Sequence, residues 1–147
     1  MPNGCKVMKR LNPVLFSSVR MDWATPQAFF DALDAEFRFT LDPCASAENA
    51  KCGKFYTAAD NGLEQDWSGE TVFCNPPYGR AVYDWVSKCW HEARKPRTTV
   101  VMLIPAHTDT RYFHEFIYHK AREIRFIRGR LRFGDGTAPF PSMIVVF

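Results

Sequence analysis

The residues most suited to chemistry are Asn75, Pro76, Pro77 and Tyr78, which follow a short apolar run at 71–74. The two prolines remove two backbone N–H donors, so this turn offers mainly acceptor oxygens. The side-chain oxygen of Asn75 and the carbonyl oxygen of Pro76 can each accept one N–H of an exocyclic amine, while the ring of Tyr78 stacks on the attached planar group. Accepting both hydrogens frees the nitrogen lone pair to attack an electrophilic methyl group. The tetrapeptide therefore predicts amine methylation.

A plainer interpretation of the same residues is an ordinary turn, because Asn-Pro dipeptides initiate many turns. The context favours the catalytic interpretation: the tetrapeptide ends a strand-like run and is followed by Gly79 and an amphipathic helix at 81–94. A strand, a turn and a helix in that order are what confirm such a motif.

Length and composition fit one globular domain. The chain has 147 residues, of which 46% are hydrophobic and 15% aromatic, enough for a core. Its net charge of +3 is too small to predict a polyanion partner alone. The five cysteines show no zinc-site spacing, so we expect free thiols and no metal. Without a stretch of about 18 apolar residues or a signal-like start, we expect a cytoplasmic protein.

Residues 1–20 are expected to form a flexible N-terminal arm before a single domain at 21–147. A helix should follow Thr25 as N-cap, with Pro26 at the first helical position. Further elements are expected from periodicity and turn residues. Strands are expected at 38–41, 71–74, 99–104, 123–128, 131–133 and 143–147, and helices at 81–94 and 109–120, with one or two helical turns near 47–54.

The alternation of strands and helices predicts an α/β fold with a mostly parallel sheet, and the consecutive strands at the end predict an antiparallel edge. In such sheets, ligands bind outside the carboxyl ends of the strands. Three strands end in Asp42, Asn75 and Pro105. We therefore expect these residues to converge on one site.

The motifs also occur in a characteristic order. They are W-A-T-P (23–26), L-D-P-C-A (41–45), N-A-K-C (49–52), Y-T-A-A-D-N-G-L (56–63), D-W (66–67), N-P-P-Y-G-R (75–80), L-I-P-A-H-T-D-T-R-Y-F-H (103–114), I-R-F-I-R-G-R-L-R-F (124–133) and A-P-F-P-S (138–142). This ordered set resembles the DNA N-6-adenine-methyltransferases of bacteriophages and prophages, a compact Dam-type family that uses S-adenosylmethionine. The resemblance covers the chain from about residue 21 onward.

The resemblance implies an abbreviated Rossmann-like methyltransferase sheet with helices on both faces. It implies that residues 75–78 form the catalytic loop and that Asp66 approaches the adenine of the cofactor. It also implies a set of residues around the methionine end of S-adenosylmethionine: Trp23, Thr25, Pro26, Asp42, Pro43 and Cys44. The chain departs from the usual pattern because no glycine follows Asp42 until Gly53.

Arginines crowd a segment near the C-terminal end of the chain. Arg128, Arg130 and Arg132 alternate, so a strand would place them on one face. They could contact DNA phosphates, which position DNA without reading its sequence, or protect an exposed sheet edge by charge. The sequence leaves both open. Arg80 and Arg111, which lie within the motifs, are further candidates for phosphate contacts.

Other residues also have two interpretations. His107 and Asp109 could line a pocket for the target, or Thr108 or Asp109 could simply cap the next helix. Phe140 could form an aromatic wall for an extruded base, or belong to a plain loop between strands. Trp85 lies on the apolar stripe of its helix and is expected in the core.

The sequence thus predicts a site-specific, S-adenosylmethionine-dependent DNA methyltransferase acting on adenine N6 in a bacterial host or prophage-bearing cell. Two alternatives stay open. The substrate could be another planar amine, such as cytosine N4, guanine N2 of RNA, or a protein glutamine. The chain could also be a DNA-binding relic of the fold without turnover.

Overall fold

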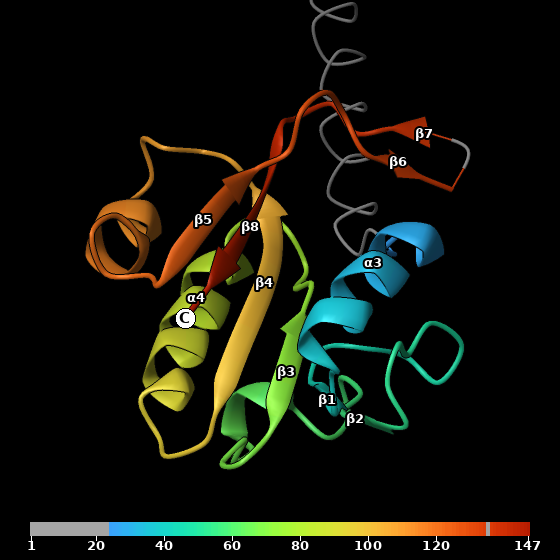
Figure 1. Ribbon diagram of the computed structural model, residues 1–147, viewed down its shortest axis with the longest axis vertical. Coiled ribbons are helices and arrows are strands. Elements are labelled where there is room, and N and C mark those ends of the chain that lie inside the picture. The colour runs from blue at the N-terminus through green and yellow to red at the C-terminus, as the bar shows by residue number, and fades with distance from the viewer. Residues whose placement is uncertain (1–23, 135) are drawn as a thin grey trace, which may run out of the picture.

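The computed structural model describes residues 24–134 and 136–147 (Figure 1). The arm expected at 1–20, and Trp23, lie outside the described residues. The elements are α3 (Gln27–Phe37), β1 (Leu41–Asp42), β2 (Lys54–Phe55), η1 (Gly62–Glu64), β3 (Thr71–Cys74), α4 (Ala81–Ala93), β4 (Thr99–Pro105), η2 (Phe113–Ile117), β5 (Glu123–Phe126), β6 (Arg132–Phe133), β7 (Gly136–Thr137) and β8 (Ser142–Val146).

Six of these strands form one sheet in the order β2-β1-β3-β4-β8-β5. The pairs β1–β2, β1–β3 and β3–β4 are parallel, whereas β8 is antiparallel to both β4 and β5. Every strand of this sheet except β8 therefore runs in the same direction. This confirms the predicted α/β fold with a mostly parallel sheet and antiparallel pairing near the C-terminus. The short strands β6 and β7 form a separate hairpin.

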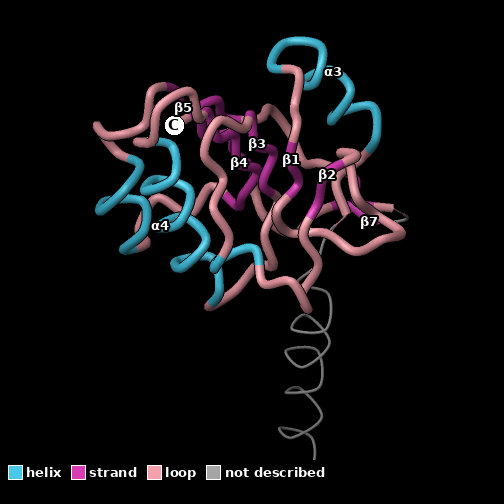
Figure 2. The backbone as a smooth tube through the Cα atoms, turned by 90° about the horizontal axis from the view of Figure 1, so that it is seen from below, coloured by secondary structure: helices cyan, strands magenta, loops and turns pink. Residues whose placement is uncertain are grey.

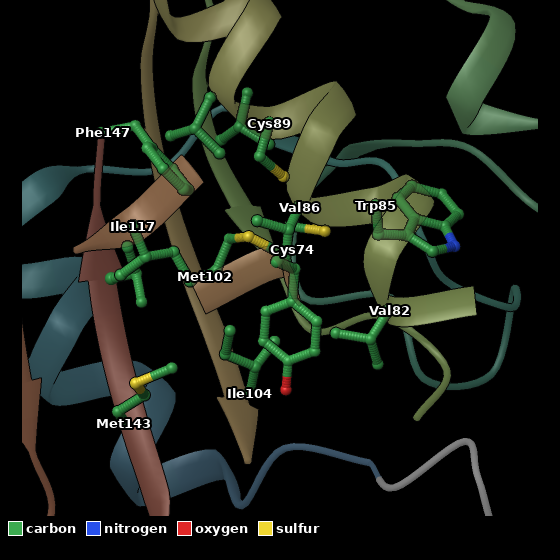
Figure 3. Packing of buried hydrophobic residues seen from close by; sticks show 14 of the residues in the cluster. Cys74, Val82, Trp85, Val86, Cys89, Met102, Ile104, Ile117, Met143 and Phe147 are labelled. Atoms are coloured by element: carbon green, nitrogen blue, oxygen red, sulfur yellow. The ribbon is translucent and has the colours of Figure 1, made fainter. Parts of the chain in front are cut away.

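The strand β4 lies at the centre of the core and is buried on both faces, as its continuous apolar run predicts. Its residues alternate between two clusters. Met102 and Ile104 face the side covered by α4, and Val101 and Leu103 face the side covered by α3. Figure 2 shows the two helices on opposite sides of the strands. In Figure 3, side chains of α4 such as Val86 point toward β3 and β4.

The strongly patterned elements confirm the predictions: β3 matches 71–74, β4 extends 99–104 by one residue, and α4 matches 81–94 within a residue. The strand expected at 38–41 is wrong, because only Leu41–Asp42 pair. Arg38 ends α3 with φ +58°, and the Asp34 carboxylate accepts the Phe39 N–H. The segment is thus used to end the helix.

The helix expected at 109–120 is shorter and is wound as a π-helix at Phe113–Ile117. Tyr118 has extended backbone (φ −63°, ψ 120°), which ends it. The expected cap is also wrong. The hydroxyl of Thr110, rather than Thr108 or Asp109, donates to the carbonyl of His107 (2.8 Å) and accepts the N–H of Phe113 (3.4 Å).

The strand expected at 131–133 is reduced to β6, and the alternation of the arginines does not place them on one strand face. Gly129 has φ +73°, which turns the chain between Arg128 and Arg130. Only Arg132 lies in a strand. Across residues 24–134 and 136–147, no helix combines the length and apolar character needed to span a membrane.

Candidate active site

The site lies where the connections of the sheet diverge. From β1 the chain continues to β2 on one side, and then crosses to β3 on the other side of β1. The carboxyl ends of β1 and β3 are therefore adjacent while their loops lead apart, which is the switch point where open α/β sheets bind ligands. Asp42 ends β1, and Asn75 follows β3. The predicted convergence is confirmed for Asp42 and Asn75, because β1 and β3 are parallel neighbours. Pro105, at the end of β4, does not line either of the cavities described below.

Two cavities lie at the carboxyl ends of β1 and β3. A small one of about 50 Å³ is lined by Ala24, Thr25, Asp42, Cys44, Asn49, Lys51, Phe73, Asn75 and Pro77. A larger one of about 400 Å³ is lined by Pro43, Cys44, Ala45, Ser46, Asn49, Thr57, Ala58, Asn61, Gly62, Pro77 and Trp85. The two cavities share the lining residues Cys44, Asn49 and Pro77, so they are neighbours. Together they connect the end of β1 to the Asn-Pro-Pro-Tyr loop.

Asp42 is the buried acidic group of the small cavity, with 5% of its surface exposed. One carboxylate oxygen accepts the N–H of Cys44 (3.3 Å), and the other accepts the N–H of Lys51 (3.1 Å). Burial raises the pKa of Asp42, and these two N–H groups and the Lys51 charge lower it in part. A cation entering the cavity would favour the ionised carboxylate. The Nζ of Lys51 donates to the Gln27 side chain (2.8 Å).

The side-chain amide of Asn75 is held from two directions. Its Nδ2 donates to the hydroxyl oxygen of Thr25 (2.9 Å), and its Oδ1 accepts the hydroxyl of Tyr78 (2.8 Å). The prediction that Thr25 caps α3 is therefore wrong. The helix begins at Gln27, and Pro26 is its N-cap residue, with extended backbone (ψ 133°). Among the described residues, no side-chain hydrogen bond caps this end of the helix. The Thr25 hydroxyl accepts the bond from Asn75 instead.

Tyr78 is buried, with 5% of its surface exposed, and burial raises the pKa of its hydroxyl. Its ring meets Phe140 edge-on, with centroids 5.2 Å apart and an angle of 82°. His107 approaches the same Phe140 ring at 6.4 Å. Aromatic side chains from three distant segments thus gather around Phe140, and one of them, Tyr78, bonds to Asn75. In this conformation the faces of the Tyr78 ring are covered.

The structure does not bring Asp66 to the cavities. Asp66 comes before the amino end of β3. Asp42 and Asn75 lie at the opposite, carboxyl ends of the strands. The exposed carboxylate of Asp66 accepts the hydroxyl of Ser68 (2.6 Å) and pairs with Lys95 (2.9 Å), which lowers its pKa. The adjacent Trp67 is fully buried. Its indole N–H donates to the carbonyl of Gly62 in η1, and its backbone N–H donates to Glu92 of α4. This Asp-Trp pair therefore anchors the loop, and its placement gives the cofactor assignment of Asp66 no support.

The candidate arginines come after β3, β4 or β5 in the chain, on the side of the sheet where these parallel strands end. Arg80 is exposed at the start of α4, and Arg111 is exposed after β4, where it pairs with Glu115 (3.1 Å) and lies over the ring of Tyr83 (4.9 Å). The three others are exposed around the turn between β5 and β6: Arg128, Arg130 and Arg132. Figure 1 shows the β6–β7 hairpin beyond the arrowheads of β4 and β5.

Several lining residues were not predicted as site residues, among them Asn49, Lys51, Asn61 and Trp85. Asn49 and Lys51 belong to a polar turn, and Asn61 adopts a left-handed conformation (φ +54°). The Asp-Asn-Gly turn signal at 60–62 could have identified the last. Trp85 is buried as predicted, yet it also lines the larger cavity. Gly62 permits this arrangement, because a Cβ at that position would lie 2.0 Å from the carbonyl oxygen of Pro43.

The fold and the cavities together define an α/β protein with a candidate ligand site at the switch point of its sheet, beside an Asn-Pro-Pro-Tyr loop. The family model for DNA N-6-adenine-methyltransferase (Dam) matches residues 14–142, and the chain belongs to this family. It is 34% identical over 116 residues to the DNA N-6-adenine-methyltransferase of Escherichia phage T1, which covers 78% of this chain. It is 41% identical over 63 residues to YfdM of Escherichia coli (strain K12), which covers 38% of this chain.

The matched region spans 48% of the length of the phage T1 relative and 69% of the length of YfdM. The chain therefore spans about half the length of the phage protein that it matches.

Proposed function

We propose that this protein transfers a methyl group from S-adenosylmethionine to the N6 amine of adenine in DNA. One observation carries the proposal: Asp42 and Asn75, at the ends of neighbouring strands, line the same cavity in a chain of this family. One residue supplies a charge for the methyl donor and the other supplies an acceptor for the amine. The open, mostly parallel sheet with its switch point supports an abbreviated Rossmann-like methyltransferase fold.

The residues of the two cavities fit S-adenosylmethionine, which supplies the electrophilic methyl group. In the small cavity, Asp42 would hold the ammonium group of the methionine end, and Lys51 its carboxylate. The larger cavity has room for the adenosine, with Trp85 as an apolar wall. The remaining residues of the methionine end would come from the segments already predicted: Trp23, Thr25, Pro26, Pro43 and Cys44.

The Asn75 side-chain oxygen and the Pro76 carbonyl would then accept the two N–H groups of the target amine. This localises the nitrogen lone pair and aims it at the methyl group. As the new N–C bond formed, the S–C bond of the donor would break, and the nitrogen would afterwards release one proton to water. No group of three or more metal-ligating side chains gathers in the part of the chain that the structure describes.

Adenine N6 is inaccessible in duplex DNA, so the base has to be extruded, at a cost of a few kcal/mol. Stacking on Tyr78 would return about 1–3 kcal/mol of that cost. Because both faces of the Tyr78 ring are covered in this conformation, its side chain or the segment that carries Phe140 has to move before a base can stack. Phe140 would then serve as the second aromatic wall.

The DNA backbone would lie across the carboxyl ends of the parallel strands, beside the site. All five candidate arginines are exposed there: Arg80, Arg111, Arg128, Arg130 and Arg132. Their phosphate contacts would position DNA without reading its sequence. The phage relative supports a reaction in the cytoplasm of a bacterial host or of a cell that carries a prophage.

The test is to incubate the protein with methyl-labelled S-adenosylmethionine and unmethylated DNA, digest the DNA to nucleosides, and identify the labelled one. We expect N6-methyldeoxyadenosine. Label on cytosine, or on protein alone, would overturn the adenine assignment. Binding of the cofactor without transfer to any of these acceptors would favour the non-catalytic alternative.

A further inference from the structure

Asn75 has a partner from a segment fifty residues earlier in the chain. Its Nδ2 donates to the hydroxyl oxygen of Thr25 at 2.9 Å, while Tyr78 donates to its Oδ1 at 2.8 Å. We propose that Thr25 is a positioning residue for methyl transfer, whose hydroxyl bonds to the Asn75 amide and restrains the rotation of that side chain. This inference rests on the proposed function.

The orientation of the amide matters because its two ends have opposite hydrogen-bonding character. The oxygen accepts and the nitrogen donates. The last torsion of an asparagine side chain has a broad, roughly two-fold profile, so shape alone does not choose between the two orientations. If the amide were rotated by half a turn, its NH2 would face the NH2 of the target base. Two donors would then oppose each other, and the acceptor that activates the amine would be lost.

Of the two contacts, the one from Thr25 lies on the cofactor side. Thr25 and Asn75 both line the small cavity together with Asp42, whereas Tyr78 does not. Tyr78 has to stack on the target base and to release its present packing in order to do so. The bond from Thr25 is therefore the contact that can persist while the base enters.

The position of Thr25 is itself fixed by α3. The N–H of Phe30 donates to the carbonyl of Pro26 (3.0 Å), which closes the first turn of the helix directly after Thr25. Phe30 packs edge-on against Phe73 of β3, with centroids 5.1 Å apart. Phe73 lies two residues before Asn75, so this ring contact packs the first turn of α3 against the end of β3. Thr25 is also buried, with 5% of its surface exposed, which removes water as a competing partner.

This role belongs to the hydroxyl of Thr25 alone, so its backbone and methyl group can still contact the cofactor as predicted from the sequence. A hydroxyl that mainly held the cofactor would change its dissociation constant when removed. A hydroxyl that orients Asn75 would change the rate of transfer once cofactor and DNA are bound. Thr25→Val keeps the shape of the side chain and removes the hydroxyl, and Thr25→Ser restores the hydroxyl without the methyl group.

The experiment measures the single-turnover rate of methyl transfer and the dissociation constant of S-adenosylmethionine for the wild type and both variants. We expect Thr25→Val to transfer about tenfold more slowly, the scale of one lost hydrogen bond, with a dissociation constant within about threefold of wild type. Thr25→Ser should recover most of the rate. A Thr25→Val rate within twofold of wild type, a loss explained by weaker cofactor binding, or no recovery in Thr25→Ser would overturn the inference.

Thr98→Val is the matched control. Thr98 is also buried, and its hydroxyl accepts the N–H of Gly69 (2.9 Å) and donates to Pro96 (3.1 Å) at the opposite edge of the sheet. This variant should transfer at the wild-type rate per folded molecule. If it slowed transfer as much as Thr25→Val, the effect would be one of general packing, which would also overturn the inference.

A second readout does not need activity. The side-chain NH2 of Asn75 can be identified in an NMR spectrum by its loss in Asn75→Asp. We expect one of its protons to exchange slowly with solvent in the wild type and quickly in Thr25→Val. Equal exchange in both would overturn the inference. If the wild type methylated no DNA at all, the proposed function would fail, and this measurement would still decide whether Thr25 holds the amide.

Discussion

Replacing Asp42 by asparagine tests the proposed cofactor site at its charged group. The change keeps the shape of the side chain and removes its charge. Asp42 is 5% exposed, and each of its oxygens accepts one backbone N–H, from Cys44 and from Lys51. The buried carboxylate therefore supplies negative charge to the small cavity at a fixed position.

The expected loss of cofactor binding follows from this burial. Removing one partner of a buried, hydrogen-bonded charge pair costs about 2–5 kcal/mol, so we expect the dissociation constant of S-adenosylmethionine to rise by about 30-fold or more. The stability should change less. An amide has only one acceptor oxygen, so one of the two N–H groups loses its partner at a cost of about 1–3 kcal/mol. Removal of a buried charge offsets part of that cost.

Isothermal titration with S-adenosylmethionine measures the effect, and Asp66→Asn is the matched control. Asp66 undergoes the same chemical change at the opposite edge of the sheet, so its variant should bind like the wild type. Unchanged affinity in Asp42→Asn, or an equal loss in both variants, would refute the reasoning.

The pH dependence of the same titration has a definite sign. Burial raises the pKa of Asp42 above its ordinary value of 3.8. The protonated form has no charge to attract the ammonium group, so wild-type affinity should fall as pH falls through this raised pKa, and Asp42→Asn should lack that decline. For folding the sign is opposite. The native state binds this proton more tightly than the unfolded state, so Asp42 lowers stability as pH rises from 3.8 through its native pKa.

Three further outcomes are expected. Glu92→Ala should lower the free energy of unfolding by about 3 kcal/mol, because it leaves two lysines and a backbone N–H without their buried partner. Burial raises the pKa of Glu92, but the two lysines bring it below its ordinary value of 4.5. The difference in unfolding free energy between wild type and variant, measured by denaturant titration, should therefore shrink as pH falls through the native pKa. A difference that stayed constant would contradict this. Tyr78→Ala should weaken binding to DNA with a mismatched target by about 1–3 kcal/mol, and binding to fully paired DNA less; equal losses would count against stacking. Joint replacement of Arg128, Arg130 and Arg132 should weaken binding to all sequences and reduce the salt slope by about one unit per lost phosphate contact, whereas an unchanged slope would make them a charged sheet edge.

The elements that the sequence predicted well are those whose burial imposes a pattern over many residues. The strand β4 is apolar after Thr99 because both of its faces are covered, and α4 shows one apolar stripe because only one of its faces is covered. The strands β1 and β2 pair over only two residues each. Two residues carry no periodicity, so their limits could not be predicted.

The site was predicted where it depends on strand ends, and missed where it depends on contacts between distant segments. Asp42 and Asn75 follow apolar runs, so a parallel sheet brings them together. The Thr25 hydroxyl lies beside a proline in a pattern typical of a helix cap, and only the three-dimensional structure shows that it bonds to Asn75 instead. Similarly, nothing near Asp66 in the sequence indicates its ion pair with Lys95.

The central claim is that the Asn75 amide activates the target amine at this edge of the sheet. The most direct test is the single-turnover rate of methyl transfer to adenine by Asn75→Ala, with cofactor and DNA both saturating. We expect the rate to fall by at least about 100-fold, the scale of one lost transition-state contact, while the dissociation constant of S-adenosylmethionine stays within about twofold of wild type. A variant that transfers methyl groups at nearly the wild-type rate would contradict the account.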